Sequence, residues 1–125
     1  MKYEREKPCA TCPYRREARL ALWSESEFLR LLKHDADPVE GLQFACHHDR
    51  TKPHEDRSAC VGWLLDQKRR HIPSLQLRMR LGYNEEAREH FTRINEDGLD
   101  LYSSVEEMYR ANYPKKGRRK CTNTV

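Results

Sequence analysis

The sequence predicts a small, metal-stapled single domain that is mostly α with a short β element. Three observations favour this fold class. The chain has 125 residues, which is room for one domain and not for two. Hydrophobic residues make up only 37% of it and charged residues 35%, so apolar side chains are scarcer than in an ordinary core. Five cysteines and six histidines could offset that shortage, because a bound metal can replace missing core contacts.

The N-terminal part of the chain predicts a tight turn followed by a helix. The run Cys9-Ala10-Thr11-Cys12-Pro13 indicates the turn, because its proline prevents a helix from running through it. Ser24 and Glu27 form a capping box ahead of apolar residues at helical spacing. We therefore expect a helix near 25–35 that ends before Pro38.

The short β element is expected directly after Gly41. There, Leu42, Phe44 and Cys46 alternate with two other side chains, a spacing of two that is typical of a strand. Residues 47–57 are almost wholly polar, so we expect a loop to follow the strand.

Further helices are expected in the second half of the chain. Ser58 and Ser74 are the predicted caps of two of them, and Gly82 is the predicted stop of the second. A polar helix is expected over 85–94. Ser103 with a glutamate three residues later predicts a last helix that Pro114 ends. These expectations give a domain over 1–114 and a basic, disordered tail over 115–125.

Four of the five cysteines have the spacing of metal ligands. Two residues separate Cys9 from Cys12, which lets both thiolates point at one ion. Cys46 ends the predicted strand, and Cys60 lies in the first turn of the next helix, where the helix dipole stabilises a thiolate. We expect these four cysteines to share one metal site and Cys121 to take no part in it.

The residues leave the identity of the metal open. Zinc is the usual ion for four cysteines, or for three cysteines and a histidine, in a small domain. His47, next to Cys46, is the possible alternative ligand. A [4Fe–4S] cluster also takes four thiolates, and the 13 residues between Cys46 and Cys60 exceed the spacing in most zinc ribbons.

The motifs around these cysteines carry a resemblance. They are Pro8-Cys9-x-x-Cys12-Pro13-Tyr14-Arg15, Phe44-x-Cys46-His47 and Cys60-x-Gly62-Trp63, with Trp23 between the first two. In combination they resemble a small uncharacterised family from actinobacteria and their phages, over roughly residues 8–65. The resemblance implies that the four cysteines act as one set, with His47, Trp23 and Trp63 around it. It implies no activity.

Basic residues gather in clusters along the chain. The net charge is +4, and the segment after Pro114 alone contributes +5 from five basic residues without an acid. Such clusters attract phosphate backbones, because binding releases counterions. The residues expected to contact nucleic acid are Arg69, Arg70, Arg78, Lys115, Lys116, Arg118, Arg119 and Lys120.

Together these features predict a small metal-binding module, with zinc the favoured ion, that is regulatory or binds nucleic acid or a transcription-related protein. One alternative is a phage-type protein-binding regulator whose metal is purely structural. Another is an iron–sulfur redox sensor. Enzymatic activity is less favoured, since four cysteine ligands leave a metal no open coordination position and no catalytic motif is present.

The sequence also predicts a cytoplasmic protein without a membrane segment. No apolar run approaches the ~20 residues that span a bilayer. The N-terminus has charged residues where a signal peptide needs an apolar stretch. In the cytoplasm thiols stay reduced, which suits metal ligands better than disulfides.

Overall fold

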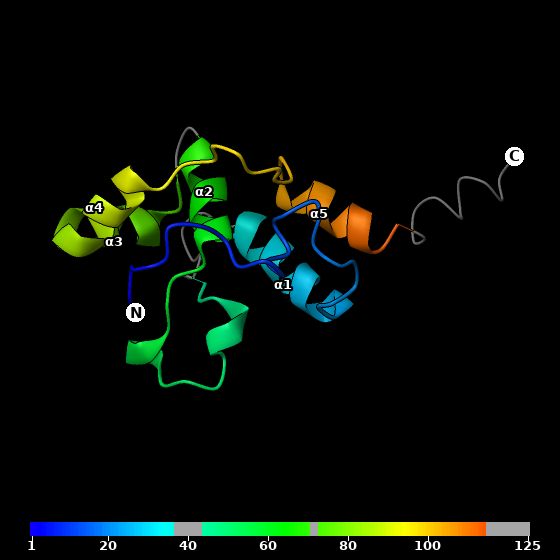
Figure 1. The fold of residues 1–125 in the computed structure, drawn as a ribbon, viewed down its shortest axis with the longest axis horizontal. Coiled ribbons are helices and arrows are strands. Elements are labelled where there is room, and N and C mark those ends of the chain that lie inside the picture. The colour runs from blue at the N-terminus through cyan, green and yellow to red at the C-terminus, as the bar shows by residue number, and fades with distance from the viewer. Residues whose placement is uncertain (37–43, 71–72, 115–125) are drawn as a thin grey trace, which may run out of the picture.

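The computed structural model describes residues 1–36, 44–70 and 73–114, and this part of the chain is mostly helical (Figure 1). The tail predicted over 115–125 lies outside the described residues. The helices are α1 (Glu25–Ala36), α2 (Val61–Arg69), α3 (Leu75–Tyr83), α4 (Glu85–Arg93) and α5 (Val105–Asn112). Two single 3-10 turns, η1 (His47–Asp49) and η2 (His54–Asp56), occupy the polar loop.

Helix α2 lies between two helical pairs. Every residue from Val61 to Gln67 is buried, although the helix is only nine residues long. Helices α1 and α5 pack together on one side of it, and α3 and α4 form a hairpin on the other (Figure 1). Buried side chains from all five helices join in one core, including Phe28, Leu64 and Met108. This arrangement confirms a small, mostly helical single domain.

Polar side chains start three of the helices. Ser74 accepts from the backbone N–H of Leu77 and caps α3, as predicted. Asn84 does the same for α4 through Ala87. The last helix is capped by Ser104 rather than by Ser103, because its hydroxyl accepts from the backbone N–H of residue 107 at 3.0 Å.

Two details of the predicted helix starts are therefore wrong. The capping box of α5 lies one residue later than expected, and Glu107 accepts from the backbone N–H of Ser103 at 2.8 Å. Ser58 caps nothing in α2, since Cys60 occupies the N-cap position there and makes no side-chain capping bond.

The predicted β element is also wrong in the described residues, where there is no sheet. Ala45 and Ala59 form only an isolated antiparallel bridge, and Lys2 and Ser58 form a parallel one. Extended pairing stops there because η1 begins directly after Cys46 and α2 directly after Cys60. The remainder of the predicted strand, Leu42 and Gln43, lies outside the described residues.

The N-terminal segment also pairs with the residues just before α5. Arg15 and Leu101 form an isolated antiparallel bridge. Beside it, the backbone N–H of Tyr102 donates to the carbonyl of Tyr14 at 2.9 Å, and that of Arg16 donates to the carbonyl of Asp100 at 2.9 Å. The residues after the first cysteine pair are thus held by the segment just before α5.

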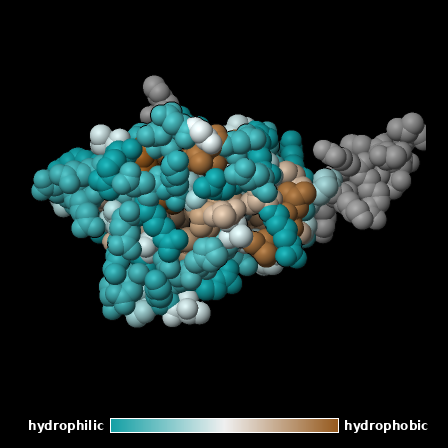
Figure 2. Space-filling view, viewed as in Figure 1, coloured by the Kyte–Doolittle hydropathy of each residue, from teal (hydrophilic) through white to brown (hydrophobic). Residues whose placement is uncertain are grey.

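Hydrophilic residues cover most of the face seen in Figure 2, with hydrophobic residues gathered in a band across its centre and beside α5. This surface agrees with the high charge content of the chain. None of the described helices combines the length and the apolarity that crossing a membrane requires.

Candidate metal centre

The first cysteine pair lies in a tight turn, as the sequence predicts. The backbone N–H of Cys12 donates to the carbonyl of Cys9 at 3.0 Å, which closes the turn. Arg15 braces it, because its Nε donates to the same carbonyl at 3.0 Å and its Nη2 reaches the carbonyl of Pro8. Arg15 thus fixes the backbone that presents the two sulfurs.

The second pair of cysteines is placed by the isolated bridge at Ala45 and Ala59. The backbone N–H of Cys46 donates to the carbonyl of Ser58 at 2.8 Å, and that of Cys60 donates to the carbonyl of Phe44 at 2.8 Å. These two bonds hold Cys46 and Cys60 beside each other, although 13 residues separate them.

The four sulfurs contact one another in a chain. The thiol of Cys9 is in hydrogen-bonding contact with Cys12 and with Cys46, and Cys12 is in contact with Cys60. Cys12, Cys46 and Cys60 are buried, whereas Cys9 is half-buried. These contacts link the four predicted cysteines, from three separate segments, as successive neighbours. Among the described residues, the group whose ligand atoms all lie within 4.8 Å of one another is instead Cys9, His47 and His48.

The pKa is lowered for two of the four thiols and raised for the other two. The hydrogen bond from Cys12 lowers the pKa of Cys9 to about 4. Hydrogen-bonding contact with Cys12 lowers the pKa of Cys60 as well. The pKa of Cys12 is raised well above its usual value because hydrogen-bonding contact with Cys60 and Cys9 favours its protonated form. Burial raises the pKa of Cys46 to about 11.

Gly62 makes this close approach possible. A Cβ on Gly62 would lie 2.6 Å from Cys12 Sγ and 2.9 Å from the side chain of Tyr14. Real Cβ atoms do not tolerate such distances, and both neighbours are buried. The glycine of the Cys60-x-Gly62-Trp63 motif is therefore a requirement of packing against the cysteine turn.

Two histidines lie on the exposed side of the cluster. Cys9, His47 and His48 offer ligand atoms within 4.8 Å of one another, so this group could hold a metal ion. His47 Nε2 is 3.3 Å from Cys9 Sγ and 3.0 Å from the hydroxyl of Thr11. His48 Nε2 is also 3.0 Å from that hydroxyl.

The indole of Trp23 determines which nitrogen of His47 carries the proton. Trp23 Nε1–H is a donor only, and it lies 3.1 Å from His47 Nδ1, which must therefore accept. The proton of the neutral imidazole is then on Nε2, facing Cys9 and Thr11. In this tautomer His47 donates an N–H to the sulfur of Cys9 and has no lone pair there to offer a metal.

Replacing Trp23 by phenylalanine is expected to release this tautomer. In the unmodified protein, histidine nitrogen NMR should show the His47 proton on Nε2. In Trp23→Phe the two tautomers should interconvert, because Nδ1 has lost its donor. Trp63→Phe is the control, since Trp63 packs edge-on against Phe44, whereas the ring beside His47 is that of Trp23. A proton on Nδ1 in the unmodified protein would contradict the assignment.

Two of the three described arginines that were predicted to contact nucleic acid instead bind groups within the chain. Arg69 donates to the carbonyl of Tyr102 at 2.6 Å and pairs with Asp66 at 3.0 Å. Arg70 pairs with the other oxygen of Asp66 at 2.9 Å. Burial nevertheless raises the pKa of Asp66 to about 6, which shows how far this carboxyl is removed from water.

Arg78 is exposed and, unlike Arg69 and Arg70, forms no ion pair with Asp66. Its Nε donates to the carbonyl of Pro73 at 3.1 Å. The remaining members, from Lys115 to Lys120, lie outside the described residues. Binding of nucleic acid stays a prediction, and within the described residues it depends on Arg78 more than on Arg69 and Arg70.

Arg69→Gln is expected to lower the free energy of unfolding by about 1–3 kcal/mol, because a buried carboxylate loses one of its partners. Arg80→Gln removes the same charge from an exposed position of α3 and should change stability by less than about 0.5 kcal/mol. Urea denaturation measures both. Equal, small effects would show that Arg69 is not structural.

Comparison with known protein families shows the family to which the chain belongs. The model of a family described as "Family of unknown function (DUF6283)" matches residues 4–123. The matched segment contains all of the motifs on which the resemblance rested, and it extends well beyond residues 8–65. No curated protein and no solved structure shows significant similarity to the chain.

Proposed function

Because the chain belongs to the family of unknown function that matches residues 4–123, we propose its function from the cysteine centre itself. We propose that Cys9, Cys12, Cys46 and Cys60 bind one structural zinc ion. The ion connects three segments of the chain and stabilises a small binding module. The single observation that carries the proposal is that every one of the four sulfurs faces an N–H donor.

The sulfurs of Cys12 and Cys60 accept hydrogen bonds from backbone N–H groups. Cys60 accepts hydrogen bonds from the backbone N–H groups of Trp63 and Gly62 at the start of α2. Cys12 accepts one from the backbone N–H of Tyr14. N–H groups aimed at sulfur stabilise the thiolate, which is the form that ligates a metal.

The sulfurs of Cys9 and Cys46 accept hydrogen bonds from His47 and His48. Cys46 accepts from the backbone N–H of His48. Cys9 accepts from the side chain of His47, in the tautomer that Trp23 selects. Four thiolates on Zn²⁺ give a centre of charge −2, and these donors offset that charge where solvent is largely excluded. His47 therefore supports the site from outside the ligand set.

The contacts between sulfurs favour a single ion over a cluster. Ligand sulfurs on one tetrahedral zinc stand about 3.8 Å apart, as Zn–S bonds of about 2.3 Å require. Three sulfur pairs are already in contact, Cys9 with Cys12, Cys9 with Cys46 and Cys12 with Cys60, and binding of the ion would bring the remaining pairs to this spacing. A four-iron cluster places its own atoms between the ligands and needs a wider opening. With four protein ligands the zinc has no open position, so its role is to stabilise the fold.

Elemental analysis of the purified chain tests the proposal. We expect one equivalent of zinc and a colourless protein, and His47→Gln and His48→Gln should each keep that equivalent. A brown protein with iron and sulfide would replace the zinc proposal by the iron–sulfur sensor. Loss of metal in His47→Gln would show that this histidine is a ligand and that the four-cysteine set is wrong.

A further inference from the structure

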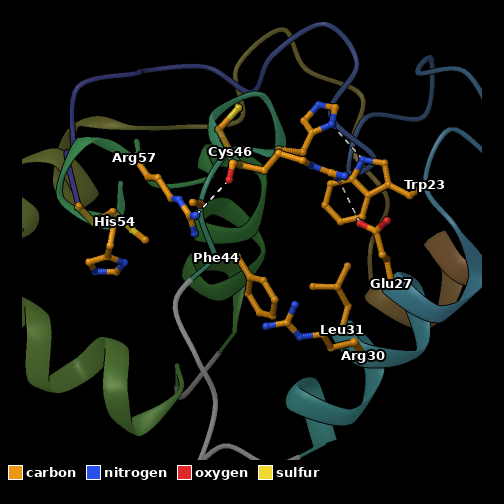
Figure 3. A pocket seen from close by; sticks show the side chains of 12 residues that line it. Trp23, Glu27, Arg30, Leu31, Phe44, Cys46, His54 and Arg57 are labelled. Atoms are coloured by element: carbon orange, nitrogen blue, oxygen red, sulfur yellow. Dashed lines mark hydrogen bonds and ion pairs between the residues drawn. The ribbon is translucent and has the colours of Figure 1, made fainter. Parts of the chain in front are cut away.

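A pocket of about 380 Å³ opens beside the proposed metal centre, with Cys46 and His47 in its wall (Figure 3). Its volume is within the usual range for pockets that bind small molecules. The pocket is lined by the start of the chain, by α1 and by the loop that carries the two 3-10 turns. None of its cationic residues is among those predicted from the sequence to bind nucleic acid.

The lining of this pocket is positively charged. It contains the arginines Arg30, Arg50 and Arg57 and one carboxylate, Glu27, so the formal charge of its side chains is +2. His54 lies beside Arg57 and adds a further polar group (Figure 3). An anion with about two negative charges would complement this lining.

The arginines of the lining have N–H donors available for a bound anion. Arg57 is held by the carbonyls of Lys52 and Arg50, at 2.8 and 3.1 Å, which leaves other N–H groups of its fork unused. Arg50 is 3.5 Å from Glu27, a long contact between half-exposed side chains. Among the described residues, no carboxylate pairs with Arg30 within 4 Å.

The other part of the lining is apolar and aromatic. Trp23, Leu31 and Phe44 lie on the side of the pocket away from Arg57 (Figure 3). The charged side chains of Arg30 and Glu27 lie on that side as well. Trp23 is held in place by its hydrogen bond to His47, and Phe44 packs edge-on against Trp63. A flat ring placed here would contact side chains that are already fixed, so little conformational entropy would be lost.

We propose that this pocket binds a phosphate monoester attached to a flat heterocycle, with the phosphate on the arginines and the ring against Trp23 and Phe44. A monoester carries a charge of about −1.5 to −2 at neutral pH, which matches the lining. Arginine forks suit phosphate oxygens, and aromatic side chains accept any nucleobase face. This chemistry belongs to a nucleoside monophosphate, either free or at the 5′ end of an oligonucleotide.

Titration calorimetry with the metal-loaded full chain tests this inference. The probes are adenosine 5′-monophosphate, adenosine, inorganic phosphate, and one oligonucleotide with either a 5′-phosphate or a 5′-hydroxyl. We expect the monophosphate to bind at least about tenfold more tightly than adenosine or inorganic phosphate, because each of those lacks one half of the contact. Preference for the phosphorylated oligonucleotide over the free nucleotide would assign the ligand to a strand end.

Matched charge variants separate the pocket from general electrostatic attraction. Arg30→Gln and Arg50→Gln should each weaken binding about tenfold, whereas Lys33→Gln, an equal charge change at an exposed position of α1, should stay within about twofold. Glu27→Gln should strengthen binding, since it removes the one acid of the lining.

The inference is overturned if adenosine binds as well as its monophosphate, if no probe binds, or if Lys33→Gln weakens binding as much as Arg30→Gln. Zinc content is measured for each variant. Full zinc with no ligand binding would overturn the pocket and leave the metal proposal standing, so the two can fail separately.

Discussion

Cys60→Ser is expected to abolish metal retention and to unfold the domain. Cys60 is the N-cap of α2, the buried central helix, and its sulfur is in contact with Cys12. Binding of structural zinc contributes about 10–16 kcal/mol in zinc-finger peptides. The whole free energy of unfolding of a small domain is about 5–15 kcal/mol. Loss of one ligand therefore removes an amount comparable to the total stability.

The measurement is zinc content per chain together with thermal unfolding followed by circular dichroism. Cys121→Ser is the matched control, because it makes the same chemical change outside the proposed ligand set and should keep one zinc and the unmodified melting temperature. Addition of a strong chelator to the unmodified chain should reproduce the effect of Cys60→Ser. Full zinc and an unchanged melting temperature in Cys60→Ser would refute the four-cysteine site.

Gly62→Ala is expected to destabilise the fold by about 3 kcal/mol, at the upper end of the cost of overpacking. The added Cβ would lie 2.6 Å from Cys12 Sγ and 2.9 Å from the side chain of Tyr14. Both neighbours are almost fully buried, so neither can move aside without disturbing the core. Displacement of Cys12 Sγ should also weaken zinc binding.

Gly82→Ala is expected to have the opposite effect and to stabilise the protein. Gly82 lies in α3 with nothing within 4 Å of its added Cβ, so alanine should stabilise the helix by about 0.5–1 kcal/mol. Denaturant unfolding of both variants, with zinc saturated, measures the difference. A Gly62→Ala variant as stable as the unmodified protein would show that the contact between α2 and the cysteine turn is looser than the geometry indicates.

The helices could be predicted from the sequence because their signals are local. Apolar spacing located α1 and α4 to within a residue or two, and Ser74 is the predicted cap of α3. The cap of α5 was misplaced by one residue, since Ser103 and Ser104 are equivalent in type and only the accepted bond from Glu107 distinguishes them. The short strand failed because pairing there extends over a single bridge.

The sequence predicted the four cysteines that contact one another, but not the groups that surround them. The spacing of Cys9 and Cys12 indicates a shared ion within four residues of sequence. The role of His47 depends on a hydrogen bond from Trp23, 24 residues earlier, which no local pattern reveals. The roles of Arg69 and Arg70 likewise depend on burial of Asp66, so a basic cluster in the sequence proves to be an internal ion-pair network.

The bond between Tyr14 and Tyr102 has a consequence for the order in which the protein is made. The cysteine turn leaves the ribosome first, but the segment that pairs with its C-terminal side is synthesised almost ninety residues later. Contacts of such long sequence separation slow folding, because the intervening loop must be closed before they form. We therefore expect zinc to be taken up tightly only after translation has passed α5, as a late step of maturation.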